Sequence, residues 1–304
     1  MALTDAPPPI RRIAVIGCGN VGASWAALFH AAGCDLTVAD PAISGVAELE
    51  ARLAPHLGAL RELGLDGAGR LERADSPETA CAQADLVQES APESAAKADL
   101  VARLDAAAPA GAIIASSTSS LLLSDLTQGC TRPDRVILAH PFHPPHLIPL
   151  VELFGTTPDV IDRAAAFYRA IGKSPVVLRR EMQGHIAGRL SAALFREAVH
   201  LVAEGVASVE DVDTALRDGP ALRWSVTGAF LAYHLGGGPG GMEAYLAHLG
   251  PSQERRWKDL GDPQLTPEIR GAILSGVAAA YGDRSMAELE VARDGALMTA
   301  LANR

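Results

Sequence analysis

The first half of the chain alternates short, apolar, β-rich runs with longer stretches in which apolar residues recur every three or four positions. The short runs predict strands, and the longer stretches, of which 21–32 and 45–63 are the clearest, predict helices. The expected strands cover residues 13–17, 35–40, 84–89, 112–116, 135–140, 148–154 and 175–178. Strands that alternate with helices are typical of a parallel sheet with helices on both faces.

From about Gly184 onward the chain is expected to be almost wholly helical. Apolar residues recur at steps of three or four over 186–204 and predict one buried helical stripe. The members of this stripe are Ile186, Leu190, Leu194, Ala198 and Leu201. Ser208, followed by Asp211, has the residue types of a helix start. The glycine-rich run 236–241 predicts a break between helices.

Length and composition leave room for two domains. The chain has 304 residues, of which 48% are hydrophobic, and this is enough for a large core. We place the boundary near Gln183, where the strand-rich part gives way to helices. The sequence therefore predicts an α/β domain with a doubly wound sheet over residues 1–183 and an all-helical domain over residues 184–304.

Charge and cysteine usage narrow the class of protein. The formal net charge is −10 and only three residues are lysine, so no dense basic surface for nucleic acid is expected. The four cysteines form no CxxC pair and are expected to be reduced thiols. The first ten residues lack the features of a secretory signal, and no apolar run is long enough to span a bilayer. We therefore expect a cytoplasmic protein that binds neither nucleic acid nor membrane.

A glycine-rich segment follows the first expected strand and opens the first expected helix. Residues 17–22 read Gly-Cys-Gly-Asn-Val-Gly and fit the pattern GxGxxG, which in this position is typical of a dinucleotide site. Gly17 permits the tight turn, Gly19 lets the backbone approach a pyrophosphate, and Gly22 lets helix and sheet pack closely. The start of the helix then offers free N–H groups to the phosphates.

Asp40 ends the next expected strand, 18 residues after Gly22, and favours NAD as the cofactor. A carboxylate at this point accepts hydrogen bonds from ribose hydroxyls and repels the extra phosphate of NADP. Residues 41–50 contain no Arg or Lys that would bind that phosphate. The expected cofactor-binding residues of this region are Gly17, Gly19, Asn20, Val21, Gly22 and Asp40.

The segment 140–146, His-Pro-Phe-His-Pro-Pro-His, carries the candidate acid–base chemistry. His140 ends one expected strand and Glu152 lies in the next, so antiparallel pairing would bring the two side chains together. A neutral imidazole can take a hydroxyl proton while a hydride leaves for nicotinamide. A carboxylate on the other ring nitrogen would fix the tautomer and stabilise the imidazolium. Upstream, the hydroxyl-rich run 116–120 follows another strand.

The same segment has a metal-site alternative, because His140, His143 and His146 form the pattern HxxHxxH. Prolines between the histidines break any helix that would align them, so we expect no metal.

These residues are where the chain resembles a known family, the L-3-hydroxyacyl-CoA dehydrogenase superfamily. Within it the chain is most similar to the branch acting on free hydroxy acids, which includes L-gulonate 3-dehydrogenase (lambda-crystallin) and L-carnitine dehydrogenase. The segments that carry the resemblance are GCGNVG at 17–22, QESAPE at 88–93, STSSL at 117–121, HPFHPPHLIPLVEL at 140–153, GHIAGRL at 184–190, REAVHLV at 196–202 and LRWSVTGAF at 222–230.

The resemblance implies a Rossmann-like N-terminal domain, a helical C-terminal domain that forms a homodimer, and a substrate cleft between them. By position, His140 would be the general acid/base and Glu152 its orienting partner. Ser119 would hydrogen-bond the substrate oxygen, and Glu89 would lie near the nicotinamide.

Two positions depart from the family pattern. His143 stands where the family usually has Asn, and Gly188 stands where a second Asn usually precedes Arg-Leu. That second Asn normally helps to hold substrate and cofactor, so its absence removes a hydrogen bond of about 1 kcal/mol. We hypothesise that His143 fills part of this space and donates a replacement hydrogen bond.

The substrate class follows from charge and from the branch. Residues 41–100 contain five Arg/Lys against eleven Asp/Glu, a poor setting for the anionic CoA carrier, so a small free hydroxy acid, carnitine- or gulonate-like, is expected. Arg223 is a candidate for gripping its carboxylate, and Trp224 for facing a cationic or apolar group; the alternative is a solvated Arg223 beside a core Trp224. Two other functions remain open: a short-chain 3-hydroxyacyl-CoA dehydrogenase, and a non-catalytic NAD-binding protein.

Overall fold

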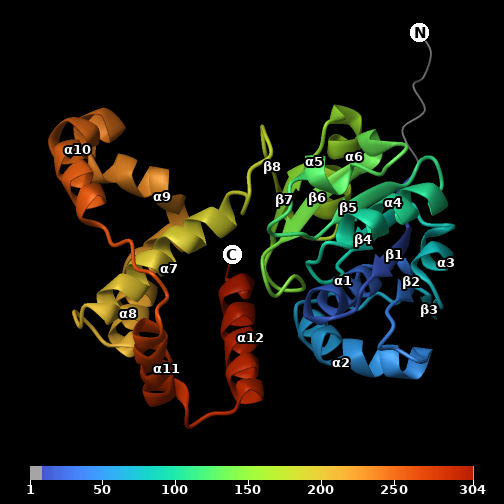
Figure 1. Ribbon diagram of the computed structural model, residues 1–304, viewed down its shortest axis with the longest axis horizontal. Helices are drawn as coiled ribbons and strands as arrows, with labels where there is room; N and C mark the ends of the chain where they lie inside the picture. The colour runs from blue at the N-terminus through green and yellow to red at the C-terminus, as the bar shows by residue number, and fades with distance from the viewer. Residues whose placement is uncertain (1–8, 304) are drawn as a thin grey trace. The chain divides into compact units, whose positions relative to one another are not determined.

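The computed structural model describes residues 9–303, which form two compact units (Figure 1). The first unit runs to Arg189 and also includes the chain from Glu290 onward. The second unit is Leu190–Leu289. Each unit has its own architecture.

The first unit is built on an eight-stranded sheet with the order β3-β2-β1-β4-β5-β6-β7-β8. The strands are β1 (Arg12–Ile16), β2 (Asp35–Ala39), β3 (Leu71–Arg73), β4 (Leu86–Glu89), β5 (Ile113–Ser116), β6 (Val136–Pro141), β7 (Leu150–Phe154) and β8 (Ser174–Val177). Neighbouring strands are parallel except β6 and β7, which are antiparallel. The expected doubly wound α/β fold is confirmed.

One strand was not expected from the sequence. β3 has only three residues and lies at the edge of the sheet, paired with β2 alone. Two of its three residues, Glu72 and Arg73, are charged, so the apolar run that marks the other strands is missing. Short, charged edge strands are common because they resist pairing with other chains.

Helices cover both faces of the sheet, and β1 shows why. Its successive side chains point to opposite faces: Ile13 and Val15 pack into one core, while Ala14 and Ile16 pack into the other. The first core is completed by α1 (Asn20–Ala31), α2 (Val46–Glu62) and α6 (Pro158–Ala170). The second is completed by α3 (Pro77–Cys81), α4 (Lys97–Ala107) and α5 (Leu123–Leu126).

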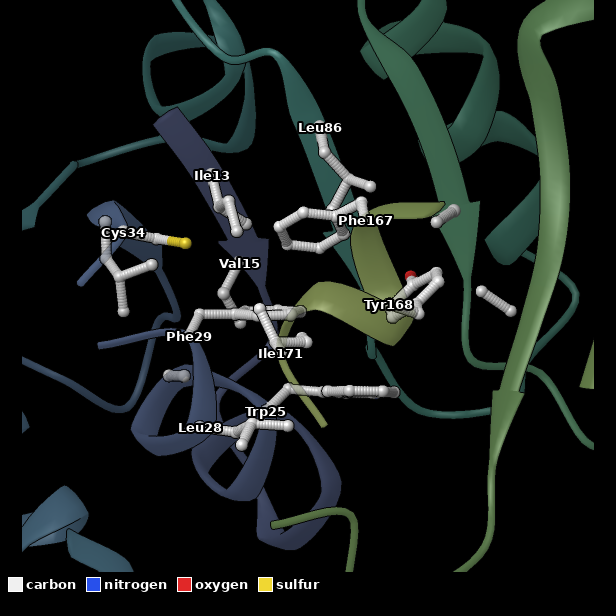
Figure 2. Close-up of a cluster of buried hydrophobic side chains, with 14 of the residues drawn as sticks. Ile13, Val15, Trp25, Leu28, Phe29, Cys34, Leu86, Phe167, Tyr168 and Ile171 are labelled. Atoms are coloured by element: carbon white, nitrogen blue, oxygen red, sulfur yellow. The ribbon is translucent and has the colours of Figure 1, made fainter. Parts of the chain in front are cut away.

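Aromatic side chains join α1 to α6 in the first core (Figure 2). Trp25 and Phe29 stack with their ring centroids 5.2 Å apart, and Phe29 contacts Phe167 at 5.8 Å. The hydroxyl of Tyr168, fully buried, donates a hydrogen bond of 2.6 Å to Oε1 of Gln88 in β4. This bond satisfies the one polar atom that the ring brings into the core.

The second unit consists of helices. These are α7 (Ala187–Ala203), which begins in the first unit, α8 (Val209–Leu216), α9 (Leu222–Gly236), α10 (Gly241–Asp259), α11 (Pro267–Tyr281) and the start of α12 (Met286–Ala302). α10 packs against α9, and α11 packs against α8. The expected helix start at Ser208 is present, because its Oγ accepts a hydrogen bond from the backbone N–H of Asp211. The expected break lies at Gly238–Gly240, between α9 and α10.

The prediction of a buried apolar stripe on α7 is wrong for most of its members. The side chains of Ile186, Leu190 and Leu194 are 45%, 68% and 37% exposed. The apolar spacing was interpreted as marking one buried stripe. Among the described residues, the second unit buries few large apolar side chains, such as Val199 and Tyr245. The other two members of the stripe, Ala198 and Leu201, are half-buried. None of the helices over residues 9–303 is long and apolar enough to cross a membrane.

Candidate active site

A cleft of about 610 Å³ opens in the first unit at the edge where its parallel strands end. It brings the glycine-rich loop and the candidate acid–base segment together, although they lie more than a hundred residues apart in the sequence. The residues that line it are Gly17, Gly19, Asn20, Val21, Asp40, Ser90, Ala91, Pro92, Glu93, Lys97, Ser117, Ser119, His140, Pro141, Phe142 and His143. Ligands of open α/β sheets bind at this edge.

The glycine-rich loop makes a tight turn between β1 and α1. Gly17 has a φ of +84°, and a Cβ there would lie 2.8 Å from the backbone N of Ala91. A Cβ on Gly22 would lie 1.8 Å from the carbonyl oxygen of Gly17, so the start of α1 packs directly on the turn. A Cβ on Gly19, by contrast, would meet no atom within 4 Å. The loop is therefore closed at Gly17 and Gly22 and open at Gly19.

The opening turn of α1 has the features of an anion site. Gly19 is its N-cap residue and provides no side-chain hydrogen bond, and the first turn contains no acidic residue. The first amides of a helix have no partners within the helix, and the helix dipole adds a partial positive charge. The open space at Gly19 and these amides together fit a pyrophosphate.

Asp40 follows β2 and ties the glycine-rich loop to that strand. Its carboxylate accepts hydrogen bonds from the backbone N–H groups of Cys18, at 2.5 Å, and Ala42, at 2.8 Å. Arg52 lies in α2, just beyond residues 41–50, which contain no Arg or Lys. It donates a hydrogen bond of 3.2 Å to the carbonyl of Cys18. Sequence reasoning missed Arg52, because it stopped at residue 50 and α2 folds back on this loop.

His140 and Glu152 face each other across the only antiparallel strand pair in the sheet of the described chain. They are direct register partners in β6 and β7, as the sequence predicted. Nδ1 of His140 lies 2.9 Å from Oε2 of Glu152. Both side chains are largely buried, with exposures of 11% and 1%. The imidazole also lines the cleft.

The second oxygen of Glu152 has its own donors. Oε1 accepts hydrogen bonds from the backbone N–H groups of Ile186, at 2.8 Å, and Ala187, at 2.9 Å. Burial raises the pKa of Glu152, but the hydrogen bonds from His140, Ala187 and Ile186 together outweigh burial and hold the pKa below its usual value. The carboxylate is therefore ionised near neutral pH and can only accept. Nδ1 of His140 must then donate, which leaves the lone pair of the neutral ring on Nε2.

Ser119 lies in the loop after β5 and is exposed in the cleft. Glu93 holds this loop: its Oε1 accepts a hydrogen bond of 2.6 Å from Oγ1 of Thr118 and one of 3.1 Å from the backbone N–H of Ser119. The segment 88–93 contains two glutamates and carries the family resemblance, but only Glu89 was predicted to lie near the site.

Glu89 is fully buried and is not among the residues that line the cleft. Its carboxylate lies 3.1 Å from Nζ of Lys97 and accepts hydrogen bonds from Ser116 Oγ, at 2.6 Å, and from the N–H of Ala91, at 2.7 Å. Burial raises the pKa of Glu89, and Lys97 opposes that rise. Lys97 also donates to the carbonyl of Ala91. This pair therefore braces the loop whose residue Ala91 packs on Gly17.

The three histidines of the segment 140–146 have different surroundings. His140 bonds to Glu152, His143 lines the cleft, and Nδ1 of His146 lies 2.8 Å from Oγ of Ser24. Burial lowers the pKa of His146 to about 3, so it is neutral. Across residues 9–303 no group of three or more His, Cys, Asp or Glu side chains is arranged to hold a metal ion.

The two departures from the family pattern lie in the first unit, and the candidate substrate residues lie in the second. A Cβ on Gly188 would meet no atom within 4 Å. The imidazole of His143 lines the cleft from the β6–β7 loop. The hypothesis that it replaces the hydrogen bond of the missing Asn stays a prediction. Arg223 is exposed and Trp224 is half-buried, both on α9 of the second unit. Their substrate roles remain predictions.

His185 is a buried residue that sequence reasoning missed. Its ring centroid lies 4.8 Å from that of His140, and its Nε2 lies 3.0 Å from the carbonyl oxygen of Thr118. It lies in the segment 184–190 that carries the family resemblance, but that segment does not reveal its partners, which are 45 and 67 positions away in the chain.

Comparison with known proteins agrees with this geometry. Residues 12–182 match the family model for the 3-hydroxyacyl-CoA dehydrogenase NAD binding domain, and residues 184–264 match that for the C-terminal domain. An L-carnitine dehydrogenase from Streptomyces griseus is 46% identical over 95% of this chain and 88% of its own length. One from Streptomyces coelicolor is 43% identical over 95% of this chain and 93% of its own length.

A solved structure shows the same fold. The NAD⁺-dependent 5-formyl-3-hydroxy-2-methylpyridine 4-carboxylic acid 5-dehydrogenase superposes with a TM-score of 0.76 at 27% identity, over 96% of this chain and 97% of that chain. The chain belongs to the 3-hydroxyacyl-CoA dehydrogenase family, and it is an NAD-dependent oxidoreductase.

Proposed function

We propose that this oxidoreductase transfers a hydride between NAD and the 3-hydroxyl carbon of a small free hydroxy acid, with His140 as general acid/base and Glu152 as its orienting partner. One observation carries the proposal. His140 is hydrogen-bonded to an ionised carboxylate and lines the same cleft as Gly17 and Gly19. In this reaction a proton leaves the substrate hydroxyl while a hydride leaves the carbon that bears it. The base must therefore lie beside the hydride acceptor.

In the direction of oxidation, Nε2 of His140 accepts the hydroxyl proton as the substrate C–H bond breaks and the carbonyl forms. NAD, when held at the glycine-rich loop, would supply the acceptor for the hydride that carries both electrons of that bond. The carboxylate of Glu152 stabilises the imidazolium that results, and it keeps the ring oriented through Nδ1. Ser119, exposed in the cleft, would donate a hydrogen bond to the substrate oxygen. In reduction, the same imidazolium returns the proton.

The cofactor would lie along the glycine-rich loop. Gly17, Gly19 and Gly22 would shape the pyrophosphate site, with Asn20 and Val21 supplying amides at the start of α1. Asp40, which lines the cleft, would accept hydrogen bonds from the ribose hydroxyls. Glu89 would act indirectly, because it braces the loop at Ala91 without reaching the cleft. The open space at Gly19 supports this placement.

L-carnitine, or a hydroxy acid like it, is the proposed substrate. The support is the identity of 41–46% to proteins named L-carnitine dehydrogenase over most of the chain. The acidic balance of residues 41–100 is a second argument against a CoA thioester. In this proposal residues 1–183 bind NAD, and residues 184–304 contribute to the substrate site through Arg223 and Trp224, together with His143 and the backbone at Gly188.

A second copy of this chain is the proposed partner of the helical domain. Large apolar side chains remain exposed across the second unit, among them Val226 at 82%, Phe230 at 84% and Trp257 at 65%. Uncovered apolar surface on this scale marks an interface. We also propose a cytoplasmic location, which the four free cysteines support, because disulfides are rare in reducing compartments.

The catalytic proposal is tested by turnover. The purified chain is expected to reduce NAD⁺ with L-carnitine and not with 3-hydroxyacyl-CoA esters, as followed by NADH absorbance. His140→Gln should lower kcat by about 100-fold or more, the usual contribution of a general base. His248→Gln, at an exposed histidine of the second unit, is the matched control and should leave kcat unchanged.

Three outcomes would contradict this proposal. Turnover of thioesters alone would identify a 3-hydroxyacyl-CoA dehydrogenase. NAD binding without turnover on any hydroxy acid would indicate a non-catalytic protein. Full activity of His140→Gln would remove His140 from the chemistry.

The cofactor placement is tested by two glycine substitutions on one loop. Gly19→Ala adds a methyl group in open space, so the fold should be kept while the Kd for NAD rises about tenfold or more. Gly22→Ala drives the same group into the carbonyl of Gly17 and should lower the unfolding free energy by about 2 kcal/mol or more. Calorimetric titration and thermal unfolding measure the two effects. Unchanged NAD affinity in Gly19→Ala would argue against the placement.

The dimer proposal is tested by sedimentation equilibrium. The chain should sediment at about twice its mass of 31.6 kDa. Phe230→Glu places a charge on the exposed apolar surface and should shift the equilibrium toward monomer, whereas Val46→Glu, at a partly exposed apolar residue of α2 in the first unit, should not. A monomeric wild-type protein at micromolar concentration would refute the proposal.

A further inference from the structure

His185 combines a rare backbone conformation with deep burial. Its φ is +49°, the only positive value at a non-glycine residue among residues 9–303. The residue is only 2% exposed. Positive φ is disfavoured for residues that carry a Cβ, although His, Asn and Asp tolerate it better than most. A glycine would adopt this backbone conformation without strain, so we infer that the imidazole itself has a role.

The side chain makes two specific contacts. Nε2 lies 3.0 Å from the carbonyl oxygen of Thr118, and because a carbonyl only accepts, Nε2 is the donor. The ring of His185 also packs on the ring of His140, with centroids 4.8 Å apart and an angle of 47° between the planes. The residue thus connects the loop that carries Ser119 with the proposed base.

The next two residues extend this connection to Glu152. The backbone N–H groups of Ile186 and Ala187 donate to Oε1 of Glu152, whose other oxygen bonds to His140. Three successive residues, 185–187, therefore contact the serine loop, the histidine and the carboxylate. They lead into α7, which begins at Ala187, so the segment lies between Gly184, with a φ of +75°, and the helix.

One hydrogen bond does not fix an imidazole. The bond from Nδ1 to Glu152 limits rotation about the Cβ–Cγ bond of His140, but coupled changes in χ1 and χ2 can still move Nε2 while that hydrogen bond is kept. A second ring packed beside it, tilted by 47°, restricts these changes. Because His185 is anchored to the carbonyl of Thr118, the same contact sets the spacing between Nε2 of His140 and the loop of Ser119.

We propose that His185 is a positioning residue of the reaction, which fixes the ring plane of His140 and its register with the Ser119 loop. The proposal rests on the proposed function of His140. His185 touches neither substrate nor cofactor in this role. A purely structural role predicts that substitutions change stability and leave the chemical step alone. A positioning role predicts that kcat falls while NAD affinity and stability are largely kept.

Three substitutions separate the ring contact from the hydrogen bond. His185→Phe keeps a ring against His140 and loses the donor, whereas His185→Gln keeps an amide donor of similar reach and loses the ring. His185→Asn loses both but suits the positive φ. We expect kcat of His185→Asn to fall about tenfold or more, since small displacements of reacting groups are costly. Phe and Gln should each restore part of kcat, with Kd for NAD within about twofold of wild type and a smaller change in KM than in kcat.

The outcomes distinguish this inference from the function on which it rests. If wild type turns over L-carnitine, His140→Gln is inactive and His185→Asn has the wild-type kcat, only the inference is overturned. It is also overturned if the three variants lose kcat strictly in proportion to their fall in unfolding temperature, with no advantage of Phe or Gln over Asn. If wild type turns over no hydroxy acid, the proposed function fails, and this inference fails with it.

Discussion

A single buried carboxylate organises the end of the sheet. Oε2 of Glu152 accepts from the ring of His140, and Oε1 accepts from the two amides that open α7. A buried charge of this kind is tolerated only when its oxygens are hydrogen-bonded, because desolvation alone costs several kcal/mol. The strand pair β6–β7, the start of α7 and the orientation of His140 therefore depend on one another.

The sheet topology places the carboxylate of Glu152 beside His140, which lines the cleft. Parallel strands β1, β2, β4, β5 and β6 all end at one edge, which brings the glycine-rich loop, the Ser119 loop and His140 to the same cleft. β7 runs the other way, so it carries Glu152 back beside His140 in direct register. Among the described strands, this one reversal is what pairs His140 with Glu152.

The sequence was informative where partners are close in the chain or where a pattern is local. The glycine-rich loop, Asp40, and the pairing of His140 with Glu152 across 12 positions could all be predicted from spacing. Glu93 and His185 lie in the segments 88–93 and 184–190 that carry the family resemblance, but their roles could not be predicted, because their partners lie 25 to 67 positions away in the chain. The stripe on α7 misled for a different reason: apolar periodicity predicts that one face of a helix is buried, but Ile186, Leu190 and Leu194 are exposed in this structure.

The tautomer of His140 tests the central claim most directly. In protein labelled with ¹⁵N-histidine, the His140 signals can be identified by their loss in His140→Gln. Near neutral pH the neutral ring should carry its proton on Nδ1, bonded to Glu152, with Nε2 unprotonated. A ring protonated on Nε2 alone would contradict the account, because no lone pair would then be available on Nε2 to accept the substrate proton.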